Sequence, residues 1–144
     1  MKKKMNLSLL FAAAMVPAMA MAGSVLDNYN PVTDERLKNP EAENWLQWRG
    51  NYESWGYSSL DQINTDNIDD LVPAWSYATG ELEGHQSPPI VNDGVMFVST
   101  PNNKVIALDA ATGQELWSFK KEIPEDLFQL HPTNRGVGLS LIPI

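Results

Sequence analysis

Short apolar runs alternate with turn residues along the second half of the chain. The four runs span residues 89–92, 95–99, 104–109 and 115–120. Asn92-Asp93-Gly94 separates the first two runs, and these residue types tolerate the positive φ that a tight hairpin turn requires. The pattern predicts four short strands joined by tight turns, which is an antiparallel meander.

The rest of the chain carries more local signals. Residues 23–43 are polar and form an N-terminal arm, which either covers another part of the protein or is a flexible tail. Asp34–Lys38 and the cap-type residues in Asn64–Leu71 each predict a short helical turn. Pro73–Tyr77 has the pattern of a strand. Five aromatic residues lie within residues 45–57, a density typical of a core or a packing surface.

The chain also contains an internal repeat. Trp75-Ser76-Tyr77 and Trp117-Ser118-Phe119 share the order Trp-Ser-aromatic, and 117 − 75 places them 42 residues apart. A period of about 40 to 50 residues with four strands per unit is typical of a β-propeller. The predicted fold class is therefore all-β, with about one propeller blade and its flanking strands in this sequence.

The first 22 residues have the pattern of a secretory signal peptide. Lys2–Lys4 form a basic start, Leu7–Val16 is an apolar run, and Ala18–Ala22 offers small-residue cleavage sites. The alternative is an uncleaved anchor, although the run is short for a membrane-spanning helix. We expect cleavage before Gly23 and a periplasmic protein with no membrane span.

Charge and cysteine usage exclude several classes of function. The chain has 10 basic and 18 acidic residues, and loss of the three lysines of the signal peptide leaves 7 against 18, a net charge of −11. Such a chain repels nucleic acids and anionic membranes, and attracts basic partners. Because there is no cysteine, disulfides, thiolate nucleophiles and cysteine metal sites are excluded.

Four motifs together point to a known family. They are Asn44-Trp45 with Arg49–Tyr52, then Ser58–Asn64, then Ala107–Trp117, which fits the tryptophan-docking pattern AxDxxTGxxxW, and finally Asn134–Gly136. This ordered set resembles the N-terminal part of the PQQ-dependent (quinoprotein) alcohol dehydrogenases of the methanol/ethanol dehydrogenase family.

The resemblance implies a fold and an activity that composition and spacing do not show. The family fold is an eight-bladed propeller with PQQ near its axis and a calcium or lanthanide ion beside it. A general-base Asp assists alcohol oxidation to an aldehyde, and electrons pass to a cytochrome c. Residues 44–139 would be the start of this propeller, and the metal ligands and the base lie downstream of that region. A homodimer of the full-length enzyme is compatible with the resemblance.

The resemblance assigns two cofactor-binding residues, Gln86 and Arg135. Gln86 lies where many family members have a Glu that contacts a PQQ carboxylate, and a neutral amide can donate to an anion at any pH. The guanidinium of Arg135 suits bidentate recognition of a carboxylate. The alternatives are a surface loop amide for Gln86 and a surface salt bridge for Arg135. We assign no catalytic residue and no metal ligand within the sequence.

Other polar residues receive structural interpretations. Asp66, Asp69 and Asp70 lack the spacing of a calcium-binding EF-hand loop, so we expect a solvated face. His85 is expected to be a hydrogen-bonding loop residue, and His131 is likewise not assigned to a metal.

Two departures from the family pattern affect the functional expectation. Gln129 and Leu130 stand where many members have a vicinal cysteine pair over the PQQ ring, so that disulfide cannot form. Residues 140–144 do not continue the family sequence, and we expect a truncated or frameshifted reading frame. The chain alone is then predicted to be unstable, aggregation-prone and inactive. The alternative function is a non-catalytic propeller that serves as a scaffold or binding module.

Overall fold

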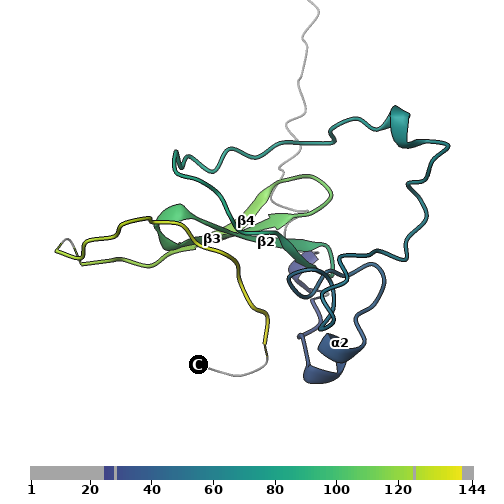
Figure 1. Ribbon diagram of the computed structural model, residues 1–144, viewed down its shortest axis with the longest axis horizontal. Coiled ribbons are helices and arrows are strands. Elements are labelled where there is room, and N and C mark those ends of the chain that lie inside the picture. Colours follow the sequence, from purple (N-terminus) through teal and green to yellow (C-terminus); the bar gives the residue numbers. More distant parts are fainter. Residues whose placement is uncertain (1–24, 28, 125, 141–144) are drawn as a thin grey trace, which may run out of the picture.

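A four-stranded antiparallel sheet lies at the centre of the protein in a computed structural model that describes residues 25–27, 29–124 and 126–140 (Figure 1). The strands pair in the order β1-β2-β3-β4, so each is hydrogen-bonded to its neighbour in sequence. Their bounds are β1 Ile90–Asn92, β2 Val95–Thr100, β3 Lys104–Asp109 and β4 Glu115–Lys120. The predicted meander is confirmed, and no strand end differs from its predicted position by more than one residue.

Residues with positive φ form the two tight connections, one between β1 and β2 and one between β2 and β3. Asp93 and Gly94 have φ of 47° and 76°, which closes the first hairpin as the sequence predicted. The short 3-10 helix η2, Pro101–Asn103, joins β2 to β3, and both of its asparagines have positive φ. Asparagine tolerates this region better than most residues with a side chain.

Two short helices lie outside the sheet. The predicted turn at Asp34–Lys38 is the helix α2, and the hydroxyl of Thr33 accepts a hydrogen bond from the Arg36 backbone N–H at 3.2 Å as an N-cap. Within the predicted 64–71 turn, the helical part is the 3-10 helix η1, Ile68–Asp70.

The predicted strand at Pro73–Tyr77 is wrong. In the described part of the chain this segment makes no β-ladder, and it is anchored through the side chain of Trp75 instead. The free edge of β1 is used by a different segment, because Trp45 forms an isolated antiparallel bridge with Val91.

The core is small and lies mainly on one face of the sheet. Its centre is Val95, Phe97 and Ala107. Half-buried side chains pack against it from the arm (Val25 and Tyr29), from β4 (Leu116) and from the last described residues (Val137 and Leu139). The arm and the last described residues therefore both contribute to the packing of the central strands.

The aromatic cluster in residues 45–57 does not belong to this core. Trp48, Tyr52, Trp55 and Tyr57 are all exposed, between 60% and 72%. The core interpretation is wrong for these four side chains, and the packing-surface interpretation stays a prediction. They begin a segment that swings in a wide arc away from the sheet and returns to it (Figure 1).

Candidate functional site

A seam between Trp75 and the turn after β3 ties the arc back to the sheet. The indole Nε1–H of Trp75 donates to the carbonyl oxygen of Ala110 at 3.1 Å. The indole ring also lies against Gly113, since a Cβ built on that residue would be only 2.5 Å from ring atoms. Gly113 has φ of +74°, so both the space and the backbone favour glycine here.

The turn that receives Trp75 is held by Asp109. Its carboxylate oxygen Oδ1 accepts from the backbone N–H groups of Ala111 at 2.9 Å and Thr112 at 2.8 Å. Its carbonyl accepts from Gly113 N–H at 2.8 Å. The role of the Ala107–Trp117 pattern is thus structural, because Asp109 shapes the turn and Gly113 leaves room for the ring of Trp75.

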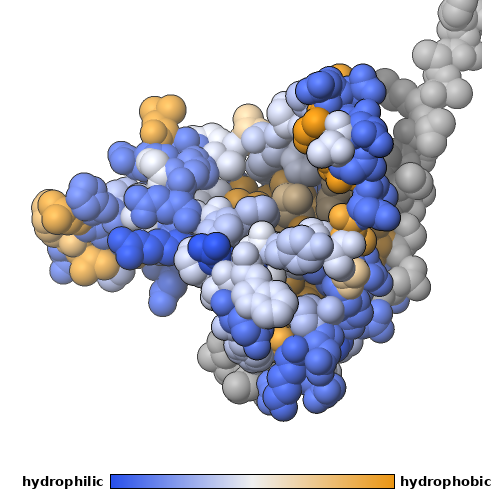
Figure 2. All heavy atoms as spheres, turned by 45° about the vertical axis from the view of Figure 1, so that its right-hand side comes forward, coloured by the Kyte–Doolittle hydropathy of each residue, from blue (hydrophilic) through white to orange (hydrophobic). Residues whose placement is uncertain are grey.

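An apolar hollow of about 180 Å³ lies beside the seam, lined by Trp75, Tyr77, Thr79, Met96, Val98, Ile106 and Leu108. In the space-filling view, hydrophobic side chains are visible deep between the elements in the middle of the molecule (Figure 2). At its rim the Tyr77 hydroxyl donates to Glu115, and this hydrogen bond raises the pKa of Tyr77 and lowers the pKa of Glu115. The residues lining the hollow offer no cation to an anionic ligand.

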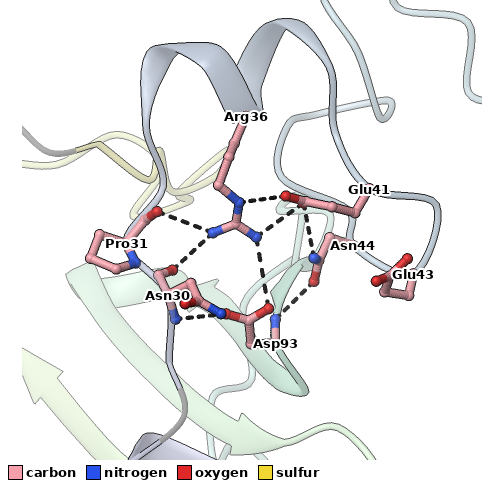
Figure 3. Close-up of a pocket in the computed structure, with 7 residues that line it drawn as sticks. All are labelled: Asn30, Pro31, Arg36, Glu41, Glu43, Asn44 and Asp93. Carbon is pink, nitrogen blue, oxygen red and sulfur yellow. Dashed lines mark hydrogen bonds and ion pairs between the residues drawn. The ribbon is translucent and has the colours of Figure 1, made fainter.

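A second cluster centres on Arg36 and joins the arm to the β1–β2 hairpin (Figure 3). Nε and Nη2 of Arg36 donate to the two carboxylate oxygens of Glu41 at 2.7 and 3.0 Å. Nη1 donates to the carbonyls of Asn30 at 2.9 Å and Pro31 at 3.1 Å, and Nη2 also reaches Asn92 Oδ1 at 2.8 Å. All five guanidinium N–H groups therefore have acceptors, which leaves none for a ligand.

The electrostatics of this cluster also indicate a structural role. The hydrogen bond from Arg36 lowers the pKa of Glu41 to about 2, and the same bond raises the pKa of Arg36. Asp93 lies 3.7 Å from Nη2 of Arg36. Glu43 lines the same pocket but its carboxylate points away from Arg36 (Figure 3). Sequence reasoning missed this cluster, because no local motif relates Arg36 to the buried Asn92.

Gln86 lies in the exposed loop that precedes β1. Within the described residues its side chain makes no hydrogen bond or ion pair, so its amide is accessible to a ligand. The neighbouring His85 bonds Thr79 Oγ1 at 2.9 Å and the Glu83 carbonyl at 3.1 Å. The prediction that His85 is a hydrogen-bonding loop residue is confirmed.

Arg135 lies on a turn that is fastened to the end of β2. Asn134 Oδ1 accepts from the buried hydroxyl of Ser99 at 2.9 Å and from the Gly136 N–H at 3.1 Å. A second link joins the Asn102 N–H to the Pro132 carbonyl at 2.8 Å. The turn is therefore ordered by two contacts to β2 and η2.

The side chain of Arg135 is exposed, and it has no acidic partner in the part of the chain that the structure describes. The salt bridge considered from the sequence is thus not formed there. Gln86 precedes the start of β1 and Asn134 binds the end of β2, so both segments lie toward the same end of the sheet. An exposed cation and a neutral amide are both donors to carboxylates, but no contact joins these two residues to each other.

The described residues contain no group of three or more His, Cys, Asp or Glu arranged to hold a metal ion. Asp66, Asp69 and Asp70 are exposed, as predicted for a solvated face. Among the described residues, no helix has the length and apolar character needed to cross a bilayer. The predicted signal peptide, residues 1–22, and most of the departing tail lie outside the described residues.

Residues 45–141 match the PQQ family described as the glucose/ethanol/alcohol dehydrogenase β-propeller domain. The chain belongs to this PQQ β-propeller family. The quinoprotein ethanol dehydrogenase of Pseudomonas putida is 35% identical to it over 133 residues, covering 89% of this chain and 21% of the relative. The putative dehydrogenase XoxF of Paracoccus denitrificans is 42% identical over 87 residues, covering 59% of this chain and 14% of XoxF.

Solved structures of the PQQ family agree with the fold. The quinohemoprotein alcohol dehydrogenase of Comamonas testosteroni aligns with a TM-score of 0.59 at 33% identity, over 72% of this chain and 15% of that one. The family resemblance and the partial-propeller fold predicted from the sequence are both confirmed. The four-stranded sheet is open, and the chain spans about a fifth of the length of the Pseudomonas putida relative.

Proposed function

We propose that this chain forms the start of the propeller, residues 44–139, of a periplasmic PQQ-dependent dehydrogenase that oxidises a primary alcohol to an aldehyde. The observation that carries the proposal is the seam between Trp75 and Gly113, which lies inside the segment matched by the family. The seam supports a blade-to-blade contact, because Trp117 repeats the Trp75 position one period later.

In this proposal Gln86 and Arg135 hold the carboxylates of PQQ. When bound, PQQ supplies the two-electron acceptor for alcohol oxidation. Arg135 provides a charged planar donor pair, and Gln86 provides a neutral donor that does not need to lose or gain a proton. The exposed, unpaired state of both side chains in the described part supports this role. The calcium or lanthanide ion would take its ligands from outside the described residues.

The electron acceptor proposed is a cytochrome c. The methanol dehydrogenase of Methylobacterium organophilum, 39% identical over 106 residues, carries cytochrome c in its name. An excess of 18 acidic over 10 basic residues would attract a basic partner. The signal-peptide pattern of residues 1–22 supports a periplasmic location, where such a partner would be met.

A chimaera tests the cofactor assignment. Residues 45–139 replace the matching segment of the Pseudomonas putida ethanol dehydrogenase, and PQQ affinity and ethanol-dependent dye reduction are measured. Arg135→Met should weaken PQQ binding by at least about tenfold, because a charge-assisted bidentate contact is lost. Arg135→Lys is the matched control. Its PQQ affinity should lie between that of the parent chimaera and that of Arg135→Met, because lysine keeps the charge but not the planar pair of donors.

The competing function is a non-catalytic propeller that serves as a scaffold. The Trp75 seam suits this function equally well, since it requires no cofactor. A folded chimaera that takes up no PQQ would favour the scaffold. Equal PQQ affinity in the parent chimaera and in Arg135→Met would contradict the role of Arg135.

A further inference from the structure

An extended segment, residues 75–79, lies over one face of the sheet without joining it. Its alternate side chains, Trp75, Tyr77 and Thr79, are half-buried, while Ser76 and Ala78 between them are exposed. A period of two is the pattern of an extended chain that turns one face toward another layer. The three half-buried side chains line one side of the apolar hollow of about 180 Å³.

Four apolar side chains of β2 and β3 form the opposite side of the hollow. Met96 pairs directly with Leu108, and Val98 pairs with Ile106, so all four lie on the same face of the two strands. Ile106 and Leu108 are only 1% and 3% exposed, whereas Met96 and Val98 are half-buried. The hollow is therefore an apolar space between two layers of the protein.

Hydrogen bonds hold the covering segment in place along its length. The Trp75 seam fixes its first residue to the turn after β3. The hydroxyl of Tyr77 donates to Glu115 on β4, and Thr79 Oγ1 bonds His85 Nε2 at 2.9 Å. Each bond uses the polar end of a side chain that lines the hollow. The segment is thus held above β2 and β3 by contacts at its polar ends, which oppose closure of the space beneath it.

The lining determines which class of molecule the hollow can accept. The polar groups of Trp75, Tyr77 and Thr79 are already engaged, so a charged or hydroxyl-rich molecule would lose hydrogen bonds to water without replacing them. An uncharged aromatic ring has no such bonds to lose. Its size is also suitable, because a cavity of about 150 Å³ lined by apolar side chains binds benzene.

We propose that this hollow is a binding site for an uncharged, single-ring aromatic molecule of about the size of benzene. The rings of Trp75 and Tyr77 offer offset or edge-to-face contacts on one side, and the side chains of β2 and β3 offer dispersion contacts on the other. The lining includes neither Gln86 nor Arg135, so the site is separate from the proposed cofactor residues and does not rest on the proposed function.

Titration of the purified full chain with benzene, followed by NMR of its methyl groups, tests the proposal. We expect saturable shifts of the Met96 and Ile106 methyl groups, with a dissociation constant of about 1 mM. Val98→Phe should weaken binding by at least about tenfold, because the new ring occupies the hollow. Val105→Phe is the matched control. It makes the same change on the opposite face of the sheet, since Val105 pairs with Ser99, and should leave the affinity unchanged.

Enlarging the hollow gives a second test, which does not depend on the folding of Val98→Phe. Val98→Ala should shift the preference from benzene toward ethylbenzene by at least about fourfold, the gain expected from one buried methylene group. Circular dichroism reports whether each variant retains the sheet. The proposal would be overturned by a wild-type chain without saturable shifts. Equal benzene affinity in Val98→Phe and the wild type, or an unchanged preference in Val98→Ala, would overturn it as well.

Discussion

Single residues determine the geometry of the Trp75 seam. Gly113 combines a left-handed φ of +74° with an indole ring that a Cβ would meet at 2.5 Å. Gly80 has almost the same backbone, with φ of +77°, but nothing lies within 4 Å of a Cβ built on it. The two glycines therefore separate backbone strain from the contact with the ring.

Gly113→Ala is expected to open the seam, whereas Gly80→Ala is not. An alanine at positive φ costs about 1 kcal/mol at either position, and overpacking against Trp75 adds about 1–3 kcal/mol at Gly113. Hydrogen exchange of the Trp75 indole N–H, followed by NMR, measures the local opening. Equal exchange rates in the two variants would mean that the ring does not rest on Gly113.

Arg36 and Glu41 make the attachment of the arm sensitive to acid. Because the folded-state pKa of Glu41 is about 2, against an ordinary value of 4.5, ionised Glu41 stabilises the attachment above about pH 4.5. This stabilisation is lost as the pH falls through the window from 4.5 to 2. The carboxylate is 37% exposed, so solvent screening reduces its energetic contribution.

We predict that amide protection in residues 34–44 decreases across this pH window. Glu41→Gln should show lower protection at neutral pH and little change through the window, because it cannot titrate. Arg36→Lys should lower protection by roughly 2 kcal/mol, since several charge-assisted bonds are lost. Hydrogen exchange with mass spectrometry measures each case. A wild-type arm whose protection is constant from pH 4.5 to 2 would contradict the assignment.

At the scale of elements, the sequence correctly predicted the features that depend on residues close together in the chain. The four strands and the Asp34–Lys38 turn follow from apolar runs, caps and positive-φ residues that act over a few positions. The 73–77 segment was predicted wrongly because its attachment is to a residue 35 positions later, through a side chain. Asn92 likewise bonds Arg36 across 56 positions, and no short pattern records that contact.

The cofactor residues Gln86 and Arg135 show the same limit. Their identities came from a family resemblance, and the turn that presents Arg135 could not be predicted from its own residues. That turn depends on Ser99, which is 1% exposed and 35 positions away from Asn134. The element that positions Arg135 is therefore the end of β2.

Replacing Ser99 by valine should loosen this turn. Valine and threonine have nearly the same shape, but only threonine keeps the hydroxyl that Asn134 accepts from. Loss of one such hydrogen bond costs about 1 kcal/mol, or about a fivefold faster exchange of the Gly136 amide. We expect that increase in Ser99→Val and not in Ser99→Thr, as measured by NMR. Equal rates would show that the Ser99 bond does not hold the turn.

At the scale of the whole molecule, the protein has much surface and little interior. Its central cluster of buried residues is Val95, Phe97 and Ala107, and many large apolar side chains are exposed. The segment from the aromatic cluster to Trp75 swings in a wide arc away from the sheet (Figure 1). A small core offsets little of the conformational entropy lost on folding.

We therefore predict that the purified chain is marginally stable, with a free energy of unfolding below about 5 kcal/mol, and does not oxidise alcohols. Urea unfolding followed by circular dichroism should give a broad transition. A sharp transition with a midpoint at high urea would contradict this prediction.

The distance along the chain between Trp75 and its turn has a consequence for the order of synthesis. The indole cannot dock until Ala110, 35 residues later, has been made and the turn around it has formed. At about 5–20 residues per second, the ribosome needs about 2–7 s for that interval. During that time the sheet itself is still being made, because β1, β2 and β3 lie between Trp75 and Ala110 in the chain, so Trp75 has no surface on which to dock. A ribosome that stalled between these two positions would leave a nascent chain whose first seam cannot close.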